Sequence, residues 1–207
     1  MSPYRLRHIR LDLQLITDLI DPNSSVLDLG CGDGALLRKL FTEKGVHGHG
    51  VEFHHPSIYA CIEKGVPVIY GDLDEGLNDY PDKSFDYVVM SRTIQVVKKP
   101  HIILNEMLRV GKIGIVSFIN FGYWPLRSQL FFRGRMPRTK TLPFQWYNTP
   151  NIHLSTIKDI REFCRAEGII VHKEINLVKE SAKHPLANLL PNLFADLAIF
   201  VLQKNDD

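Results

Sequence analysis

The stretch Val-Leu-Asp-Leu-Gly-Cys-Gly-Asp-Gly at residues 26–34 decides the fold of this chain. Apolar residues typical of a β-strand end at three alternate glycines, and the run from Ala35 to Leu40 has helical character. This predicts a strand, a tight turn and a helix. Glycine lets such a turn adopt positive φ and lets a ligand approach the main chain, while the amides of the helix N-terminus face it. The stretch therefore predicts a small-molecule site; the alternative is an ordinary buried turn.

Two classes of ligand bind at such turns, and the glycines alone do not separate them. Gly30, Gly32 and Ala35 also satisfy the dinucleotide pattern G-x-G-x-x-A. However, Asp28 and Asp33 flank the turn, and two carboxylates repel a pyrophosphate at short range. S-adenosylmethionine (SAM) has a sulfonium and an α-amino group but no phosphate, and D-x-G-x-G resembles the first motif of class I methyltransferases. We therefore interpret the turn as a SAM site.

Length and composition predict a single domain over residues 1–207. The chain is 44% hydrophobic and 23% charged, which is enough for one well-packed core. A net charge of +2 does not by itself indicate nucleic-acid or membrane binding. We find no signal-peptide pattern, no apolar run long enough for a membrane span, and three scattered cysteines without C-x-x-C spacing. These features predict a cytoplasmic protein.

Alternating helical and β-type segments predict the architecture. A leading helix is expected over residues 11–20, and a polar loop over 179–192 before the last strand. Strands are expected at 26–29, 46–53, 66–70, 84–90 and 113–119, from 169 onward, and at 195–202. Strands separated by helices of this length indicate an α/β fold with a doubly wound, mostly parallel, seven-stranded sheet.

Three further positions extend the predicted cofactor site. Glu52 lies at the end of the second strand, 20 residues after Gly32, where an acid accepts hydrogen bonds from ribose hydroxyls. Asp72 follows the third strand, where its carboxylate and the next amide, that of Leu73, can read an adenine edge. An Asx turn explains Asp72 equally well. Ser91 ends the fourth strand and is a candidate for the cofactor wall.

Residues 120–150 break this rhythm. They contain both tryptophans, eight of the twenty aromatic residues, five basic residues and no acidic one. So long a connection is typically functional. We rank a protein-partner surface first, a lid over the cofactor second and an RNA contact third, because five charges over this length are a thin electrostatic footprint. A small hydrophobic cluster with solvated arginines is the structural alternative.

No catalytic or metal-binding constellation is evident. His47, His49, His54 and His55 cluster at the second strand without a Cys or carboxylate at metal-ligand spacing, so no metal is expected. The fourth strand ends without the N-P-P-Y motif of enzymes that methylate amide or base nitrogens. His153 and Tyr123 are conceivable bases, but each is as easily structural. The catalytic residues are therefore left unassigned. Cys164 is expected in the core.

The chain resembles the methionine biosynthesis protein MetW family over nearly its whole length. The resemblance rests on VLDLGCGDGALL (26–37), GDLD (71–74), FDYVV (85–89), NEMLRVG (105–111), RGRMPRTK (133–140) and LPFQWYNTPNIH (142–153). The last two stretches are the specific ones, because they lie in the 120–150 segment, which generic methyltransferases do not share.

This resemblance implies a class I methyltransferase fold with an antiparallel last strand, and a role in methionine biosynthesis beside a homoserine O-acyltransferase, whose contact we place at 120–150. It implies no methyl acceptor. The expected cofactor is SAM or S-adenosylhomocysteine, with contacts from Asp28, Gly30, Cys31, Gly32, Glu52, Phe53, Asp72, Leu73 and Ser91. The leading hypothesis is a SAM-binding protein that regulates the acyltransferase; the alternative is an active small-molecule methyltransferase.

Overall fold

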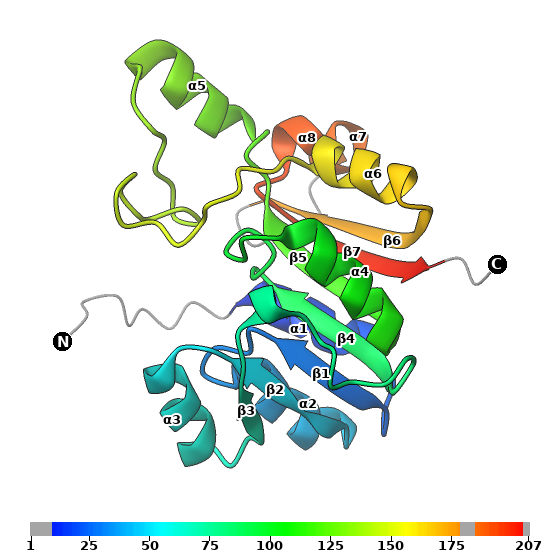
Figure 1. The fold of residues 1–207 in the computed structure, drawn as a ribbon. Helices are drawn as coiled ribbons and strands as arrows, with labels where there is room; N and C mark the ends of the chain where they lie inside the picture. Colours follow the sequence, from blue (N-terminus) through cyan, green and yellow to red (C-terminus); the bar gives the residue numbers. More distant parts are fainter. Residues whose placement is uncertain (1–9, 179–184, 205–207) are drawn as a thin grey trace.

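The computed structural model describes residues 10–178 and 185–204. Seven strands form one sheet in the order β3-β2-β1-β4-β5-β7-β6, which confirms the predicted fold class (Figure 1). The strands are β1 Ser25–Leu29, β2 His47–Glu52, β3 Val68–Tyr70, β4 Phe85–Ser91, β5 Gly111–Ile119, β6 Ile169–Leu177 and β7 Leu197–Lys204. All pairings among β1 to β5 are parallel. β7 runs antiparallel to both of its neighbours, so the expected antiparallel last strand is present.

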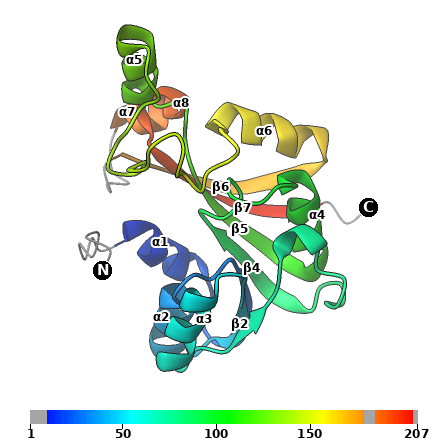
Figure 2. The same cartoon turned by 60° about the vertical axis from the view of Figure 1, so that its left-hand side comes forward.

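Helices cover both faces of the sheet (Figure 2). The helices α1 Leu11–Leu19, α2 Ala35–Lys44 and α3 His55–Glu63 pack on one face; α4 Pro100–Val110 and α6 Ile157–Ala166 pack on the other. A capping box between Thr156 and Asp159 fixes the start of α6. In the described helices, none combines the length and hydropathy needed to cross a membrane.

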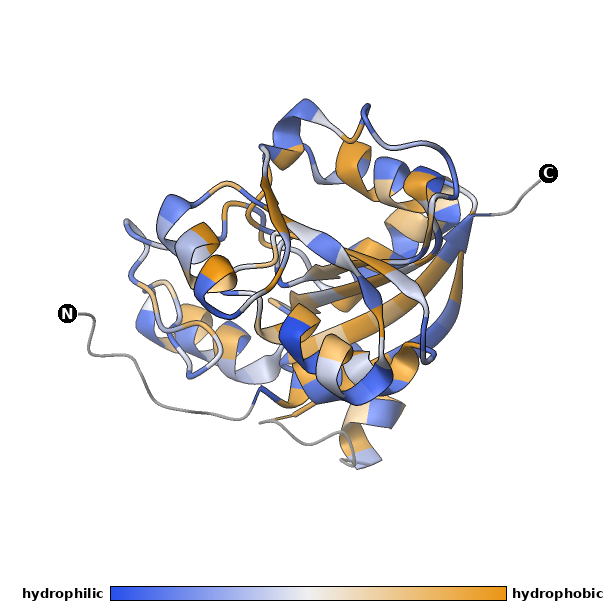
Figure 3. Ribbon diagram, turned by 90° about the horizontal axis from the view of Figure 1, so that it is seen from below, coloured by the Kyte–Doolittle hydropathy of each residue, from blue (hydrophilic) through white to orange (hydrophobic). Residues whose placement is uncertain are grey.

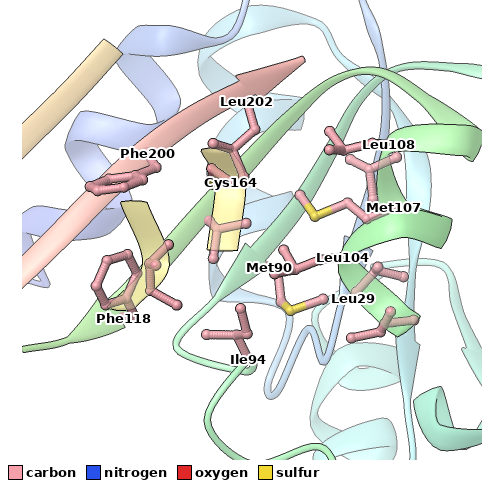
Figure 4. Packing of buried hydrophobic residues seen from close by; sticks show 14 of the residues in the cluster. Leu29, Met90, Ile94, Leu104, Met107, Leu108, Phe118, Cys164, Phe200 and Leu202 are labelled. Atoms are coloured by element: carbon pink, nitrogen blue, oxygen red, sulfur yellow. The ribbon is translucent and has the colours of Figure 1, made fainter. Parts of the chain in front are cut away.

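The core consists of two apolar layers separated by the sheet. One contains Val26, Val89 and Ile199 with the buried sides of α1 and α2. The other joins Met90, Phe118 and Phe200 to α4 and to Cys164 of α6, and Phe118 and Phe200 meet edge to face at 5.2 Å (Figure 4). The hydropathy colouring shows largely hydrophobic strands in the interior and helices that combine hydrophobic and hydrophilic residues (Figure 3). Cys164 thus lies in the core, as expected.

The prediction of a polar loop over residues 179–192 is wrong for the residues that the structure describes there. Two short helices occupy it, α7 Pro185–Leu189 and α8 Pro191–Phe194; residues 179–184 lie outside the described part. Each helix begins at a proline, which is favoured in the first turn. Elements this short show no helical periodicity in the sequence. Ala187 of α7 is 0% exposed and packs in the core, so tertiary packing stabilises this helix.

The segment 120–150 leaves the body of the sheet as an arm. It contains the helix α5 Trp124–Arg133, and residues 134–150 form neither helix nor strand. A small hydrophobic cluster is buried at its base, made by Ile119 of β5 with Tyr123, Leu126 and Leu142. Figures 1 and 2 both show α5 projecting beyond the sheet, on the side of α7 and α8. The arm is therefore anchored at its base and exposed elsewhere.

Candidate functional site

The glycine turn lies at the carboxyl end of β1, where β1 is flanked by β2 and β4 and the strand order reverses. Such a switch point is where open α/β sheets bind ligands. The amides of Gly30 and Cys31 both donate to the Val51 carbonyl, at 2.8 and 3.2 Å, which fixes the turn to β2. Gly30 has φ of 71°, and a Cβ there would lie 2.5 Å from the Thr93 side chain. Position 30 therefore has no room for a side chain.

Glu52 braces the same turn from β2. Its Oε2 accepts from the Gly32 amide at 2.8 Å, and its Oε1 accepts from the amides of Phe53 and His54 at 2.9 Å. The carboxylate is therefore held at the mouth of the turn in one orientation. This is the position that the 20-residue spacing predicts for a ribose acceptor.

Among the acids of the site, Asp28 has the pKa that departs most from its usual value. It is 1% exposed, and its Oδ1 has no hydrogen-bond partner in the described structure. Burial raises its pKa to about 7; the negative charge of Glu52 adds to this increase, and the positive charge of Arg10 opposes it. A buried carboxylate oxygen without a partner is costly, and it marks a place prepared for a cation or a donor.

A small cleft of about 60 Å³ joins these residues. It is large enough for a few heavy atoms, such as an amino group and its neighbours. Its lining comprises Arg10, Leu13, Asp28, Gly30, Cys31, Gly32, Asp33, Ala35, Leu36 and Ser91. Five expected contact residues, Asp28, Gly30, Cys31, Gly32 and Ser91, therefore lie around one opening.

An ion network that we did not predict closes the cleft. Arg10 Nη2 lies 2.8 Å from Asp12 Oδ2 and donates to Ser91 Oγ at 2.9 Å, while Arg92 Nε lies 2.9 Å from the same Asp12 oxygen. Burial alone would raise the pKa of Asp12, but the hydrogen bond from Arg10 and the charges of Arg10 and Arg92 hold it below its usual value. Arg92 has φ of 61°, which is uncommon for a residue other than glycine. No short-range sequence pattern signals this contact, because α1 and β4 are distant in the chain.

The predicted adenine end lies beside a second, larger hollow of about 480 Å³. Asp72 lines it, and its Oδ1 accepts from the Asp74 amide at 2.9 Å, so the Asx turn considered above is present. The side chains of Leu73 and Phe53 line neither hollow. Leu73 packs in the core, and the exposed Phe53 ring lies 5.6 Å from that of Tyr70. For Leu73, the expected contact is through its amide.

Several other candidates have structural partners. Tyr123 is buried in the small cluster at the base of the arm, and His153 lies 3.3 Å from the Lys98 carbonyl. His49 pairs with the Tyr80 hydroxyl at 2.9 Å. Burial raises the pKa of the Cys31 thiol, which lies 3.9 Å from Cys61 Sγ. Across residues 10–178 and 185–204, no three metal-ligating side chains lie close enough to hold an ion.

The pKa of Asp28 predicts how ligand affinity depends on pH. A raised carboxyl pKa means that the unliganded protein is most stable with Asp28 neutral, and that this contribution is lost as the pH rises through about 7. A cationic ligand favours the ionised form. SAM affinity is therefore expected to rise between pH 5 and 7, by up to about tenfold per pH unit.

Calorimetric titration in buffers of different ionisation enthalpy measures this rise and the proton released on binding. Asp28→Asn removes the titration while keeping the shape of the side chain, so its weaker affinity is expected to be flat over the same range. An equal slope in the variant and the parent protein would assign the titration to another group.

The sheet order, the antiparallel β7 and the site at the switch point define a protein of the class I methyltransferase fold. Two solved structures share this fold: a SAM-dependent methyltransferase from Mesorhizobium loti and a possible histamine N-methyltransferase from Thermotoga maritima. The first has a TM-score of 0.69 and 12% identity, covering 94% of this chain and 98% of that one. The second has a TM-score of 0.67 and 18% identity, covering 94% and 88%.

The chain belongs to the family of the methionine biosynthesis protein MetW, whose model matches residues 10–202. It is 34% identical to the bifunctional methionine biosynthesis protein MetXA/MetW of Rhodopirellula baltica, over 96% of this chain. The match covers 33% of that relative, so the chain spans about a third of the relative's length. It is thus a methyltransferase-fold protein associated with methionine biosynthesis.

Proposed function

We propose that this protein binds SAM, or its product S-adenosylhomocysteine, and acts with or regulates a homoserine O-acyltransferase. The main support for SAM as the cofactor is the buried Oδ1 of Asp28, which has no hydrogen-bond partner in the described structure. It lies beside a glycine turn whose Gly32 amide donates to Glu52. In this proposal Asp28 and the turn receive the amino-acid end of SAM, Glu52 the ribose, and Asp72 with the Leu73 amide the adenine. Cys31, Phe53 and Ser91 supply the walls.

The residues present fit such a ligand better than a dinucleotide. The cleft at the turn is bordered by Asp28 and Asp33, and Glu52 lies against it. Asp33 is paired with Lys64 and Arg10 also lines the cleft, so Asp28 and Glu52 are the carboxylates that favour a ligand with an amine and a sulfonium over one with a pyrophosphate. When bound, SAM would supply an activated methyl group; the chain's own residues would orient it and screen it from water.

The proposed partner follows from the family and from the relative named MetXA/MetW, which combines two methionine biosynthesis proteins in one chain. Fusion keeps two modules at high effective concentration, as expected for modules that work together. We place the contact on the arm, residues 120–150. Six of its eight aromatic residues are more than 40% exposed: Trp124, Phe131, Phe132, Phe144, Trp146 and Tyr147. Exposed aromatics beside arginines are typical of protein interfaces.

Thermal unfolding in the presence of SAM, S-adenosylhomocysteine or NAD tests which of these compounds the protein binds. At a hundred times its dissociation constant, a true ligand stabilises the protein by about 2.7 kcal/mol. For a chain of this size that corresponds to a shift of roughly 5 to 10 °C. We expect the shift with the first two compounds. A shift with NAD alone would replace the SAM proposal with a dinucleotide-binding one.

Co-purification with the acyltransferase, and the rate of that enzyme with and without this protein, test the partner. We expect a complex and a changed rate. A methyltransferase of an unknown small molecule is the second candidate, favoured by the methyltransferases that share the fold. Methyl transfer from labelled SAM to a metabolite pool, with no complex and no rate change, would favour it.

A further inference from the structure

A groove lies between the arm and the short helices that precede β7. Its volume is about 290 Å³, and it is lined by Arg127, Lys158, Arg161, Leu189, Leu190, Pro191, Asn192 and Leu193. These residues come from α5, α6, α7 and α8, which lie near one another in both Figure 1 and Figure 2. The groove is separate from the cleft at the glycine turn, with which it shares no lining residue.

Buried hydrogen bonds hold the walls of the groove in place. The side-chain Nδ2 of Asn120, a residue with 0% exposure, donates to the carbonyls of Asn192 and Ala195 at 3.1 and 2.8 Å, joining the start of the arm to α8. Asn120 Oδ1 also accepts from the Ile157 amide at 3.2 Å. Because one buried side chain connects β5, α6 and α8, the groove is preformed.

The groove is positively charged. Arg127 and Lys158 are exposed, and no acidic side chain lines the groove. Arg161 is paired with Glu174 at 2.7 and 2.8 Å, so the first two cations supply the excess charge. Within the described residues, the Lys158 ammonium has no ion pair. The arm adds no acid, because residues 120–150 carry five basic residues and none that is acidic.

The positive charge of the groove comes from side chains and not from free backbone amides. The first backbone amides of α6 already donate hydrogen bonds within the protein. The Lys158 amide donates to Asn192 Oδ1 at 3.2 Å, and the Asp159 amide donates to Thr156 Oγ1 at 3.3 Å. A phosphate at this helix N-terminus would find no free amides there. Long, flexible cations suit carboxylates presented by a partner's surface.

Exposed apolar side chains surround the charge. Leu189 and Leu190 are 74% and 51% exposed, and Phe131 on α5 is 82% exposed. Arg127 and Phe131 are four residues apart, so they lie on the same side of α5. Arg127 Nη2 donates to the Asn192 carbonyl at 3.5 Å, but neither it nor Lys158 forms an ion pair within the described residues. Side chains this large and this exposed, next to such cations, indicate a protein partner with both apolar and acidic groups.

We infer that this groove docks an acidic segment of the homoserine O-acyltransferase that carries an apolar anchor side chain. The inference rests on the proposed function for the identity of the partner, and on charge complementarity for its chemistry. Carboxylates of the segment face Arg127 and Lys158, while the anchor packs against Leu189, Leu190 and Phe131. The contact extends the interface from the arm to α6, α7 and α8.

The test measures the affinity of the full chain for the acyltransferase in low and moderate salt. The double variant Arg127→Glu/Lys158→Glu is expected to weaken binding by about 100-fold, because it presents carboxylates to carboxylates. Leu189→Ser is expected to weaken binding by about tenfold through loss of the apolar contact. Parent affinity is expected to fall as salt rises, and the double variant is expected to lose this dependence.

Matched controls lie on the other side of the sheet. Arg38→Glu on α2 and Tyr59→Ser on α3 change an exposed cation and an exposed aromatic residue, and both are expected to bind like the parent. Circular dichroism and thermal unfolding without ligand show whether every variant is folded. If the parent binds the acyltransferase and the groove variants bind equally well, the groove inference is wrong and the proposed function stands. If the parent binds no acyltransferase, the partner proposal itself fails; binding of RNA oligonucleotides instead, lost in the double variant, would assign the groove to RNA.

Discussion

Replacement of Glu52 by alanine is expected to abolish measurable SAM binding. In the proposed site, this carboxylate accepts from two ribose hydroxyls, and it already accepts from the amide of Gly32 at 2.8 Å. The variant loses the ligand's acceptor and the brace of the glycine turn together. Because hydrogen bonds to charged groups contribute about 1.5–3 kcal/mol each, affinity is expected to fall by at least about 100-fold.

Calorimetry and the SAM-induced thermal shift both measure this loss. Glu63→Ala is the matched control, since Glu63 is an exposed acid at the end of α3, away from the turn. Glu52→Gln separates charge from shape and is expected to bind with intermediate affinity. SAM binding of parent strength in Glu52→Ala would remove the ribose role from this residue.

Replacement of Gly48 by alanine is expected to have the largest effect on stability. Gly48 pairs with Val26 between β2 and β1, with φ of 147°. A Cβ at this position would lie 1.8 Å from the Val26 carbonyl oxygen, and backbone atoms of a central strand do not move aside. We expect a loss of more than about 4 kcal/mol in the free energy of unfolding, in the range seen for severe core changes.

Urea unfolding, followed by circular dichroism, measures this loss. Gly168→Ala is the control, because Gly168 also has positive φ, 65°, but a Cβ there meets nothing within 4 Å. It isolates the conformational cost, expected at about 1–2 kcal/mol. Equal losses in the two variants would show that β1 and β2 can separate without penalty. If Gly48→Ala gives no folded protein, its expression relative to Gly168→Ala gives the same ranking.

The proximity of the proposed cofactor residues was predictable because local units set their positions. Asp28 and Gly30 belong to one strand and its turn, and Glu52 ends the next strand of the same βαβ unit. The parallel register Leu29↔Val51 then brings the end of β2 to the turn. Any chain that forms this unit places these three residues together, so their spacing alone was sufficient.

The sequence shows the unusual composition of the arm but not which segments of the chain pack against it. Arg127 is one of the arm's five basic residues, whereas Leu189 falls in the predicted loop over 179–192 and Lys158 lies in neither stretch. The buried amide of Asn120 joins their elements across distant parts of the chain. The groove therefore exists only in the folded protein.

By itself, the sequence determined the fold class, the alternation of strands and helices, and the glycine turn with Asp28 and Glu52. These follow from hydrophobic periodicity and from spacing within one βαβ unit. Only the tertiary structure decided the Arg10–Asp12–Arg92 network, the helices α7 and α8, and the basic groove beside the arm. The reason is physical: these features depend on contacts between segments far apart in the chain, whose meeting is fixed by burial of the whole core.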